Sequence, residues 1–377
     1  MNPVRNSVLR QDFYGDIYKR IMKISNGMKN TKIQLKLIPF FLIITFILTG
    51  CVKLALPAHS PLEENQDYAE SETEDKDEGI VDLVDFFDNQ PAIIKHQKLP
   101  VAIIIDNFSS AWPLDGLSDA LVVYEAPVEA DITRLLAIFN QDFWPKKIGP
   151  VRSARPYFAD WATEYYGLFI HAGGSPQVLN NIANGLYDFY DLNEVSGDGI
   201  YFWRDSQRLG PHNLYILPES IEQAIEKKNW SPNVNDNFLE WEIKENFVFL
   251  ENEISSSIIK IGYQEPVIWQ FDQSMNSYFR YQNNKSFVDE KGQIRSPNVI
   301  IQKTGIEILD EVGRREIKTI GQGEALVFQA GQVIKGTWTK NQTTKRTFFY
   351  DQQGEKIKFL PGPIWIEIVG NNHKIFY

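Results

Sequence analysis

Residues 168–183 read LFIHAGGSPQVLNNIA, and this stretch indicates how the first half of the chain folds. The apolar run at its start, Leu168–Ile170, is typical of a buried strand. Two glycines and a serine–proline pair follow, and Gln177–Ala183 then has the spacing of an amphipathic helix. A strand that passes through a glycine turn into a helix is typical of α/β domains.

The same alternation of strands and helices extends in both directions from this stretch. The predicted strands are 101–105, 121–128 and 135–139, and the further predicted helices are 156–166 and 218–228. The helix at 156 begins with a proline, which is tolerated in the first turn because that N–H has no partner within a helix. We therefore expect residues 96–230 to form an α/β domain.

From residue 262 the pattern changes to short strands separated by Gly, Asn and Asp turns. The strand candidates are 267–271, 278–281, 298–302, 325–328, 347–350 and 364–369. We predict a mostly β domain over 262–377, joined to the first domain by a connecting region at 231–261. The expected fold class is an α/β N-terminal domain followed by a mostly β C-terminal domain, which is α+β overall.

The beginning of the chain has the features of a bacterial lipoprotein signal. The apolar run Leu37–Leu48 is too short to span a bilayer, which takes about 20 residues, but it fits the apolar part of a secretory signal. Leu-Thr-Gly then precedes Cys51, as in a lipobox, where the cysteine is acylated and the chain is cut before it. We predict a signal peptide at 28–50, preceded by a mis-called start at 1–27. An ordinary signal anchor, or a buried helix with an incidental cysteine, is the alternative.

A lipidated Cys51 would place the protein on the extracytoplasmic face of the cell membrane, with the lipid as its membrane contact. Residues 51–95 are expected to be a flexible linker, because 61–88 contains twelve acidic residues against Lys76 alone. Cys51 is the only cysteine, which excludes a disulfide framework and thiol-dependent catalysis. No basic stripe follows, so we expect no nucleic-acid partner.

Three polar clusters in the α/β region contain more charged and glycine residues than a core needs. The first, GPVRSARPY at 149–157, places Arg152 and Arg155 just before a predicted helix. Guanidinium groups near a helix N-terminus favour an anion. The alternative is that both arginines pair with acids such as Glu125 and Glu129.

The second cluster is HAGGSP at 171–176. Gly173 and Gly174 follow a strand, where successive backbone N–H groups can form a nest for an oxyanion. Ser175 is a candidate nucleophile, although the proline directly after it departs from the Gly-x-Ser-x-Gly elbow. The alternative is that Ser175 caps the helix that follows.

The third cluster, at 202–215, contains the polar residues Arg204, Arg208, His212 and Asn213. Histidine titrates near neutral pH, which suits His212 and His171 to proton transfer or metal binding. Either histidine could be paired with an acid such as Asp106 or Glu125. No metal-binding spacing is present, so we expect neither a metal nor another cofactor.

Several of these motifs are long enough to be specific for a family. They are GPVRSARPY at 149–157, HAGGSP at 171–176, FWRD at 202–205 and PHNLY at 211–215, with further agreement at 298–302, 336–338, Lys340, 361–362 and 365–366. Together they resemble the YerB-like lipoprotein family over residues 96–377. The resemblance implies a lipid-anchored, extracytoplasmic protein with two consecutive domains, and it implies no particular molecular activity.

Three functions remain open from the sequence. The first is a binding protein for an anionic envelope ligand, such as a wall-precursor phosphate or a lipid headgroup. Its pocket would contain Arg152, Arg155, His171, Gly173, Gly174, Ser175, Arg204, Arg208, His212 and Asn213. The second is a cell-wall hydrolase or transferase with His212 or His171 as general acid/base and an oxyanion donor in the backbone of Gly173 and Gly174. Its acidic partner would be Asp106 or Glu125. The third is a scaffold for an envelope protein complex, so whether the chain is an enzyme is left open.

Overall fold

The computed structural model describes residues 98–142, 144–231, 240–244, 255–343 and 345–377. The predicted signal peptide, Cys51 and the acidic linker lie outside these residues. Within the described ranges, no helix combines the length and the apolar character that crossing a membrane requires.

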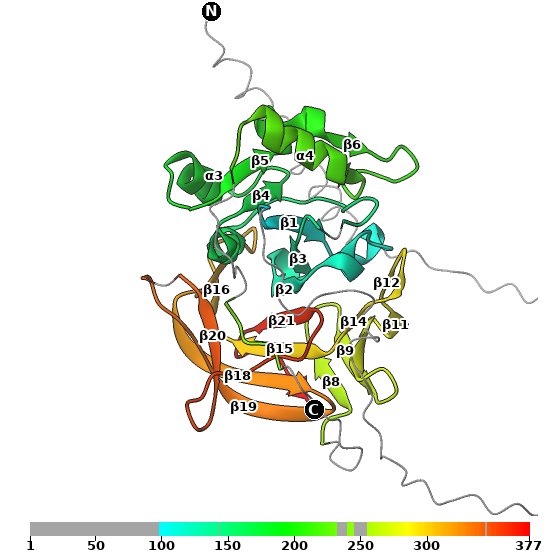
Figure 1. Cartoon of the computed structure of the whole chain (residues 1–377), viewed down its shortest axis with the longest axis vertical. Helices are drawn as coiled ribbons and strands as arrows, with labels where there is room; N and C mark the ends of the chain where they lie inside the picture. Colours follow the sequence, from blue (N-terminus) through cyan, green and yellow to red (C-terminus); the bar gives the residue numbers. More distant parts are fainter. Residues whose placement is uncertain (1–97, 143, 232–239, 245–254, 344) are drawn as a thin grey trace, which may run out of the picture. The chain divides into compact units, whose positions relative to one another are not determined.

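Strands of the first half pair side by side in the order β2-β3-β1-β4-β5 (Figure 1). They are β1 (Val101–Asp106), β2 (Val122–Pro127), β3 (Thr133–Phe139), β4 (Leu168–His171) and β5 (Tyr190–Asn193). β1, β4 and β5 are parallel, and β3 runs antiparallel to β1 and β2. Every residue of β1, β2 and β3 is buried. Strands that are covered on both faces have continuous apolar sequences, which is why the sequence predicted them.

The α-helices of the first half are α2 (Pro156–Ala162), α3 (Pro176–Ala183) and α4 (Pro218–Lys227). Each begins with a proline, as the first turn of a helix allows. A 3₁₀ turn, Thr163–Tyr165, extends α2 to nearly the predicted end. Core residues lie on both faces of the sheet. Ile103 and Ile105 pack on one face and Ile104 on the other, because successive side chains of a strand point in opposite directions.

Strands of the second half continue the same sheet. β21 (Ile364–Val369) pairs in parallel with β2, in a register that sets Glu125 opposite Glu367. The sheet then continues through β15 (Asn298–Lys303), β18 (Gly321–Gln329), β19 (Gln332–Lys340) and β20 (Thr347–Asp351). The result is a ten-stranded sheet to which both halves contribute, from β20 at one edge to β5 at the other (Figure 1).

A smaller sheet and three two-stranded sheets complete the described strands. The smaller sheet contains β8 (Ile258–Ile261), β9 (Val267–Asp272), β10 (Ser277–Gln282), β11 (Lys285–Ser286), β14 (Arg295–Ser296) and β22 (Ile375–Phe376). The pairs are β6 (Phe202–Arg204) with β7 (Leu214–Ile216), β12 (Val288–Asp289) with β13 (Gly292–Gln293), and β16 (Ile306–Ile308) with β17 (Arg315–Ile317). The predicted fold class, α/β followed by mostly β, is confirmed.

The sequence analysis missed β5, β8 and β19, and it also missed the strands of two or three residues, which are β6, β7, β11, β12, β13, β14, β16, β17 and β22. β19 leaves most of its residues partly or fully exposed, and β8 alternates exposed and buried residues within the predicted connecting region. A strand with one open face lacks the continuous apolar run that identified β1.

Candidate active site

Asp106 ends β1 at the carboxyl edge of the parallel strands β1, β4 and β5. Ligands of open α/β sheets bind outside this edge. The Asp106 side chain is 5% exposed, and its Oδ1 accepts a hydrogen bond from the backbone N–H of Phe108 at 3.0 Å. This leaves Oδ2 to contact two side chains from other parts of the chain.

A line of hydrogen bonds runs from Asp106 through His212 to Ser110, and we call these three residues the serine site. Nδ1 of His212 lies 2.7 Å from Oδ2 of Asp106, and Nε2 lies 2.9 Å from Oγ of Ser110. With the ring proton on Nδ1, beside the carboxylate, Nε2 accepts the hydroxyl hydrogen of Ser110. This arrangement of acid, histidine and hydroxyl is one that activates a serine as a nucleophile.

Exposure increases along the serine site from the acid to the nucleophile. The side chain of His212 is 18% exposed against 5% for Asp106, and Ser110 is exposed. Ser110 lies in a 3₁₀ turn, Ser109–Ala111, that follows β1. The ring of Phe108, whose centroid is 5.9 Å from that of His212, borders the site on its apolar side. A substrate from solvent can therefore reach the hydroxyl while the carboxylate stays inside.

Arg208 holds the turn of Ser110 against the segment that carries His212. Its guanidinium donates hydrogen bonds to the carbonyl oxygens of Ala111 and Pro113 and to the hydroxyl of Tyr215. Burial raises the pKa of Tyr215 to about 12, so this hydroxyl stays protonated near neutral pH. Arg208 therefore positions the serine site, and most of its donors are already used.

Arg152 reaches Asp106 because its segment lies between β1 and the loop after β4. The N–H of Arg152 donates to the carbonyl of Ile104 at 2.9 Å, and its carbonyl accepts from the N–H of Ala172 at 3.0 Å. Nε of Arg152 is then 3.0 Å from Oδ2 of Asp106, in an ion pair. The side chain of Arg152 is 24% exposed, so part of its guanidinium reaches the surface next to the serine site.

Asn213 and Arg204 stabilise the loop that contains His212. The side-chain amide of Asn213 donates to the carbonyls of Asp205 and Arg208 at 3.2 and 3.3 Å. Arg204 donates to Oδ1 of Asn213 and to Glu194, each at 3.1 Å, and its side chain is 49% exposed. Arg152, Arg204, Arg208 and Asn213 thus all contact the serine site or the segments that hold it.

His171 lies in a separate and closed arrangement. It is fully buried, with Nε2 2.8 Å from Asp191 and Nδ1 2.7 Å from the carbonyl of Gly173. Both ring nitrogens are therefore engaged. The N–H of Gly173, which we expected in an anion nest, donates to the side chain of Asn193 at 2.8 Å. The tertiary structure thus fills this nest with a side chain of its own.

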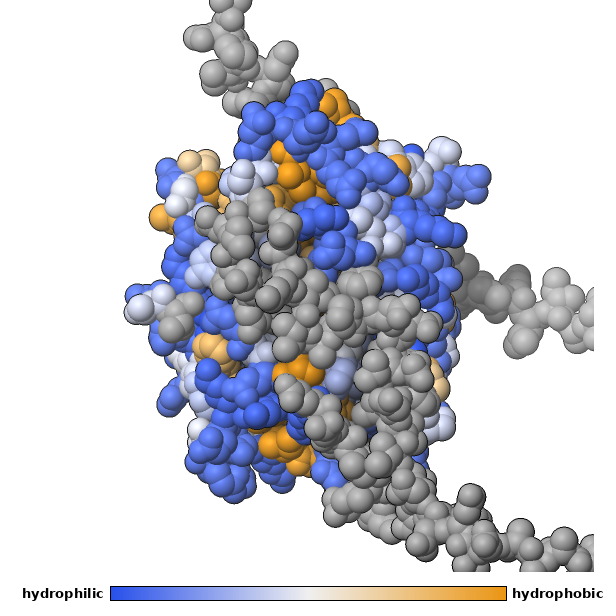
Figure 2. Space-filling view, viewed as in Figure 1, coloured by the Kyte–Doolittle hydropathy of each residue, from blue (hydrophilic) through white to orange (hydrophobic). Residues whose placement is uncertain are grey.

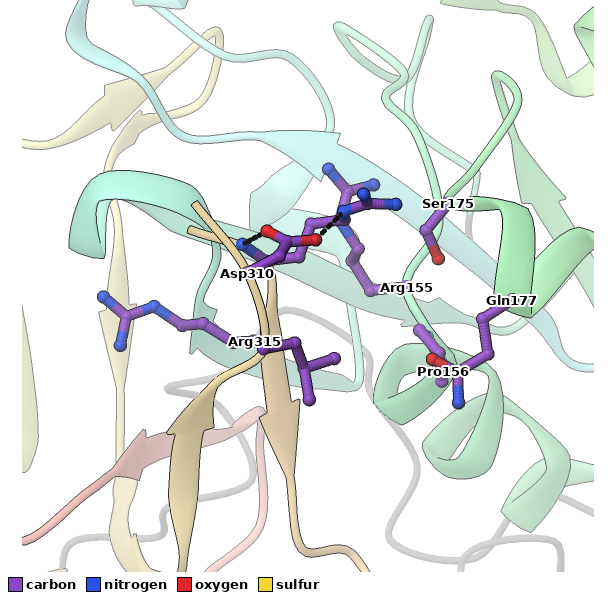
Figure 3. A pocket seen from close by; sticks show the side chains of 8 residues that line it. Arg155, Pro156, Ser175, Gln177, Asp310 and Arg315 are labelled. Carbon is purple, nitrogen blue, oxygen red and sulfur yellow. Dashed lines mark hydrogen bonds and ion pairs between the residues drawn. The ribbon is translucent and has the colours of Figure 1, made fainter. Parts of the chain in front are cut away.

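Ser175 and Gly174 both have structural roles. For Ser175 this role is the helix cap that the sequence analysis gave as the alternative to a nucleophile. Ser175 is the N-cap of α3 and accepts a hydrogen bond from the N–H of Val178. A Cβ on Gly174 would come within 2.7 Å of the Val178 side chain, so close packing requires a glycine there. Ser175 lines a cavity that contains no residue of the serine site (Figure 3).

Arg155 lines that same cavity and pairs with an acid, as one of the two interpretations of its motif expected. Nε and one terminal nitrogen of Arg155 lie 2.9 and 2.6 Å from Oε1 of Glu129. Burial acts to raise the pKa of Glu129, but the charge and hydrogen bonds of Arg155, a backbone hydrogen bond and the charge of Arg134 together lower this pKa. The ten residues predicted to line one pocket are therefore divided between several arrangements.

Glu125, the other acid considered as a partner for histidine, lies in the interior instead. It is fully buried, and one terminal nitrogen of Arg280 is 2.8 Å from both of its oxygens. Its further donors in the described structure are Asn107, Thr133 and Trp365. The contacts with Arg280 and Trp365 join β2 to strands of the second half, so Glu125 holds the two halves together. The sequence analysis placed Glu125 at the functional site, and the structure corrects that prediction.

Sequence reasoning missed Ser110, because its local sequence contains no nucleophile motif. The hydroxyl meets His212 across 102 residues of chain, and only the tertiary structure brings them together. The available signal was weak: a serine pair shortly after a strand that ends in an acid. Among the described residues, no group of three or more His, Cys, Asp or Glu side chains is placed to hold a metal ion.

Comparison with known proteins identifies relatives of both halves of the described region. Residues 90–231 match "Protein of unknown function (DUF3048) N-terminal domain", and residues 259–366 match the corresponding C-terminal domain. The chain is 33% identical over 278 residues to "Putative lipoprotein YerB" of Bacillus subtilis (strain 168), covering 72% of this chain and 82% of the relative. The crystal structure of the YerB protein from Bacillus subtilis superposes with a TM-score of 0.64 at 30% identity, covering 74% of this chain and 94% of that one. The chain therefore belongs to the DUF3048 family of YerB-like proteins, as the resemblance in its motifs predicted.

Proposed function

We propose that this chain is a lipid-anchored, extracytoplasmic protein that catalyses acyl transfer at the serine site, to water as a hydrolase or to an acceptor in the cell envelope. The observation that carries this proposal is one histidine that bonds a buried carboxylate through Nδ1 and an exposed serine hydroxyl through Nε2. A general base needs a hydroxyl within hydrogen-bond reach, and the nucleophile needs access to substrate; the serine site has both.

The reaction follows from the order of these groups. Oγ of Ser110 attacks the carbonyl carbon of an ester or amide while its proton passes to Nε2 of His212. The same proton then moves to the leaving oxygen or nitrogen as the bond to the carbonyl carbon breaks, which leaves the acyl group on Ser110. Water or an acceptor hydroxyl attacks the acyl carbon next and gives its proton to Nε2 of His212. Nε2 then passes this proton to Oγ of Ser110 as the bond between Oγ and the acyl carbon breaks. The carboxylate of Asp106 stabilises the imidazolium in each step.

The exposed arginines support an anionic substrate, which is the ligand class that the sequence predicted for a binding protein. Arg152 and Arg204 flank the segment of His212, and their side chains are 24% and 49% exposed. Each uses part of its guanidinium on a carboxylate of the protein, and a guanidinium has five N–H donors. The remaining donors suit a carboxylate or phosphate of an envelope component, so binding such a ligand is the first step of the proposed reaction.

A fluorophosphonate probe tests this proposal without knowledge of the substrate, because it phosphonylates only activated serines. The full-length protein in detergent is treated with the probe, and the adduct is located by peptide mass spectrometry. We expect one adduct, on Ser110, in the wild type and none in Ser110→Ala. Labelling should fall strongly in His212→Ala.

Ser109→Ala is the matched control, because Ser109 is also exposed and lies in the same turn, while the hydrogen bond to His212 comes from Ser110. It should label at the wild-type rate. Absence of an adduct on Ser110 in a wild-type protein that is folded by circular dichroism would show that the histidine does not activate this serine.

The proposed location rests on Cys51 and on the name of the Bacillus subtilis relative. One acyl chain gives only marginal membrane binding, whereas the two chains of a diacylglyceryl group hold a protein stably. Cells fed a clickable fatty acid should label the wild type and not Cys51→Ala. Equal labelling of both proteins would contradict the lipid anchor. It would not bear on the proposed reaction at the serine site.

A further inference from the structure

A cavity of about 140 Å³ lies between the start of α3 and the β16–β17 hairpin, and we call it the α3 cavity. Its lining comes from both halves of the chain: Arg155, Pro156, Ser175 and Gln177 from the first, and Leu309, Asp310, Arg314 and Arg315 from the second. In Figure 3, Ser175 and Gln177 lie opposite Asp310, and the guanidinium of Arg315 points away from them. Arg155 and Arg314 are therefore the guanidinium groups that matter for its chemistry.

Positive charge exceeds negative charge around the α3 cavity. Arg155 pairs with Glu129, and Arg314 pairs with Asp310, each at 2.6 Å. Arg134 is 7% exposed and donates to the carbonyl of Ser153, and no carboxylate in the described structure forms an ion pair with it. Burial, together with the nearby charge of Arg155, lowers the pKa of Arg134 to about 10. Arg134 does not line the cavity, but it adds a positive charge near Arg155, and an anion bound by Arg155 would relieve the repulsion between these two groups.

The walls of the α3 cavity also have hydrogen-bond donors left to offer. Arg155 uses three of its five N–H groups on Glu129 and Ala154, and Arg314 donates from its side chain to Asp310 through Nε. The hydroxyl of Ser175 accepts from the backbone and keeps its hydrogen to donate. The exposed amide of Gln177 stands in the first turn of α3, where backbone N–H groups lack helical partners.

The size and the donor geometry indicate which anion fits. Pockets for drug-sized ligands have volumes of about 300 Å³ or more, so this cavity takes one charged group and not a whole polymer unit. Donors from Arg155, Ser175, Gln177 and Arg314 outnumber the two oxygens of a planar carboxylate and suit the several oxygens of a tetrahedral phosphate better.

We propose that the α3 cavity binds a phosphate group, held by Arg155 from the first half of the chain and Arg314 from the second. This goes beyond the proposed acyl transfer and does not rest on it. Arg152 and Arg155 are three residues apart in an extended segment, where such side chains point to opposite faces, so the two sites face different directions. A phosphate held here would bridge the two family domains and tether a phosphate-bearing envelope component to the protein.

Calorimetric titration of the full-length protein in detergent, at constant ionic strength, tests the proposal. The probes are inorganic phosphate, glycerol 3-phosphate, the phosphodiester glycerophosphoglycerol and, as a carboxylate, acetate. We expect saturable binding of at least one phosphate probe, and a loss of about tenfold or more in affinity in Arg314→Gln. Preference for the diester would identify a lipid headgroup as the source, and preference for inorganic phosphate would identify a free ion.

Matched variants separate this site from general charge effects and from the serine site. Gln177→Ala, at an exposed position, should weaken binding without affecting the fold. Lys303→Gln removes a cation at the end of β15 that pairs with Glu324 of β18. This variant should bind phosphate as the wild type does. Ser110→Ala should also bind normally, whatever its effect on labelling. No phosphate binding with a Kd on the order of 1 mM or tighter, equal losses in Lys303→Gln and Arg314→Gln, or tighter binding of acetate would each overturn the proposal.

Discussion

Asp106 and Glu125 are carboxylates of the same sheet in opposite environments. Asp106 ends β1 and leads through His212 to an exposed hydroxyl. Glu125 lies inside β2, where Arg280 binds both of its oxygens and neither side chain has any exposed surface. Asn107 directly follows Asp106 in the sequence and donates to Glu125. The chain therefore passes from an open network to a closed one within a single residue.

The difference between the two networks lies in the partners of each carboxylate. Asp106 bonds a histidine, which can accept and release a proton near neutral pH. Glu125 bonds a guanidinium, an indole N–H, an amide and a hydroxyl, and none of these groups exchanges protons readily at that pH. A buried carboxylate thus becomes reactive or structural according to the group that neutralises it and the access of that group to solvent.

Asp106→Asn should have the largest effect and only on the open network. The amide keeps the shape of the carboxylate but favours the wrong histidine tautomer, a change that costs about 10⁴-fold in serine proteases. We expect a comparable fall in the rate of fluorophosphonate labelling of Ser110, measured by time-resolved mass spectrometry. Asp191→Asn is the control. It alters the pair of Asp191 with His171, which is also a carboxylate–histidine pair but does not contact Ser110. Equal losses in the two variants would refute the distinction between the pairs.

Arg280→Met should break the closed network and leave Glu125 buried without its cation. Removing one partner of a buried ion pair costs about 3–5 kcal/mol, and we expect a loss of this size in the free energy of unfolding. Urea denaturation measures it. Lys291→Met removes the partner of Asp119 at a side chain that is 55% exposed, and it should cost less than about 1 kcal/mol. A loss for Arg280→Met as small as that of the control would contradict a structural role for Glu125.

Glu367→Gln should sharpen the comparison by removing a pH dependence of the closed network. Burial, with the charge of Glu125 opposite, raises the pKa of Glu367 well above its usual value. The folded protein then retains a proton that the unfolded chain releases near pH ~4.3, so this stabilisation is complete below that pH and is lost as the pH rises through the raised pKa.

The slope of the unfolding free energy should reach at most ~1.4 kcal/mol per pH unit in the wild type and flatten in Glu367→Gln. The glutamine oxygen can still accept from Nε1 of Trp269, which lies 2.7 Å from Glu367. Urea denaturation at several pH values above ~5 provides the measurement. Glu324→Gln, at an exposed ion pair with Lys303, should keep the wild-type slope. Identical slopes in the three proteins would rule out a titration of Glu367 in this range.

Much of the fold could be predicted from single segments of sequence. β1, β2 and β3 have continuous apolar sequences because both faces are covered, and α2, α3 and α4 each begin at a proline. Asp106, Arg152 and His212 were identified as candidates because polar side chains at a strand end or in a dense cluster are unusual in a core. Ser110 was not, because a serine in a polar turn is ordinary until a histidine lies beside it.

The sequence by itself determined the fold class, the family and the predicted lipid-bearing Cys51, because each depends on residues that are close together in the chain. The tertiary structure alone decided that β2 and β21 join both halves in one sheet, that Glu125 is closed in by Arg280, and that Ser110 meets His212. These contacts link residues more than 100 positions apart. Local patterns of apolar and polar residues specify strands and helices, but they do not specify which side chains meet when those elements pack together.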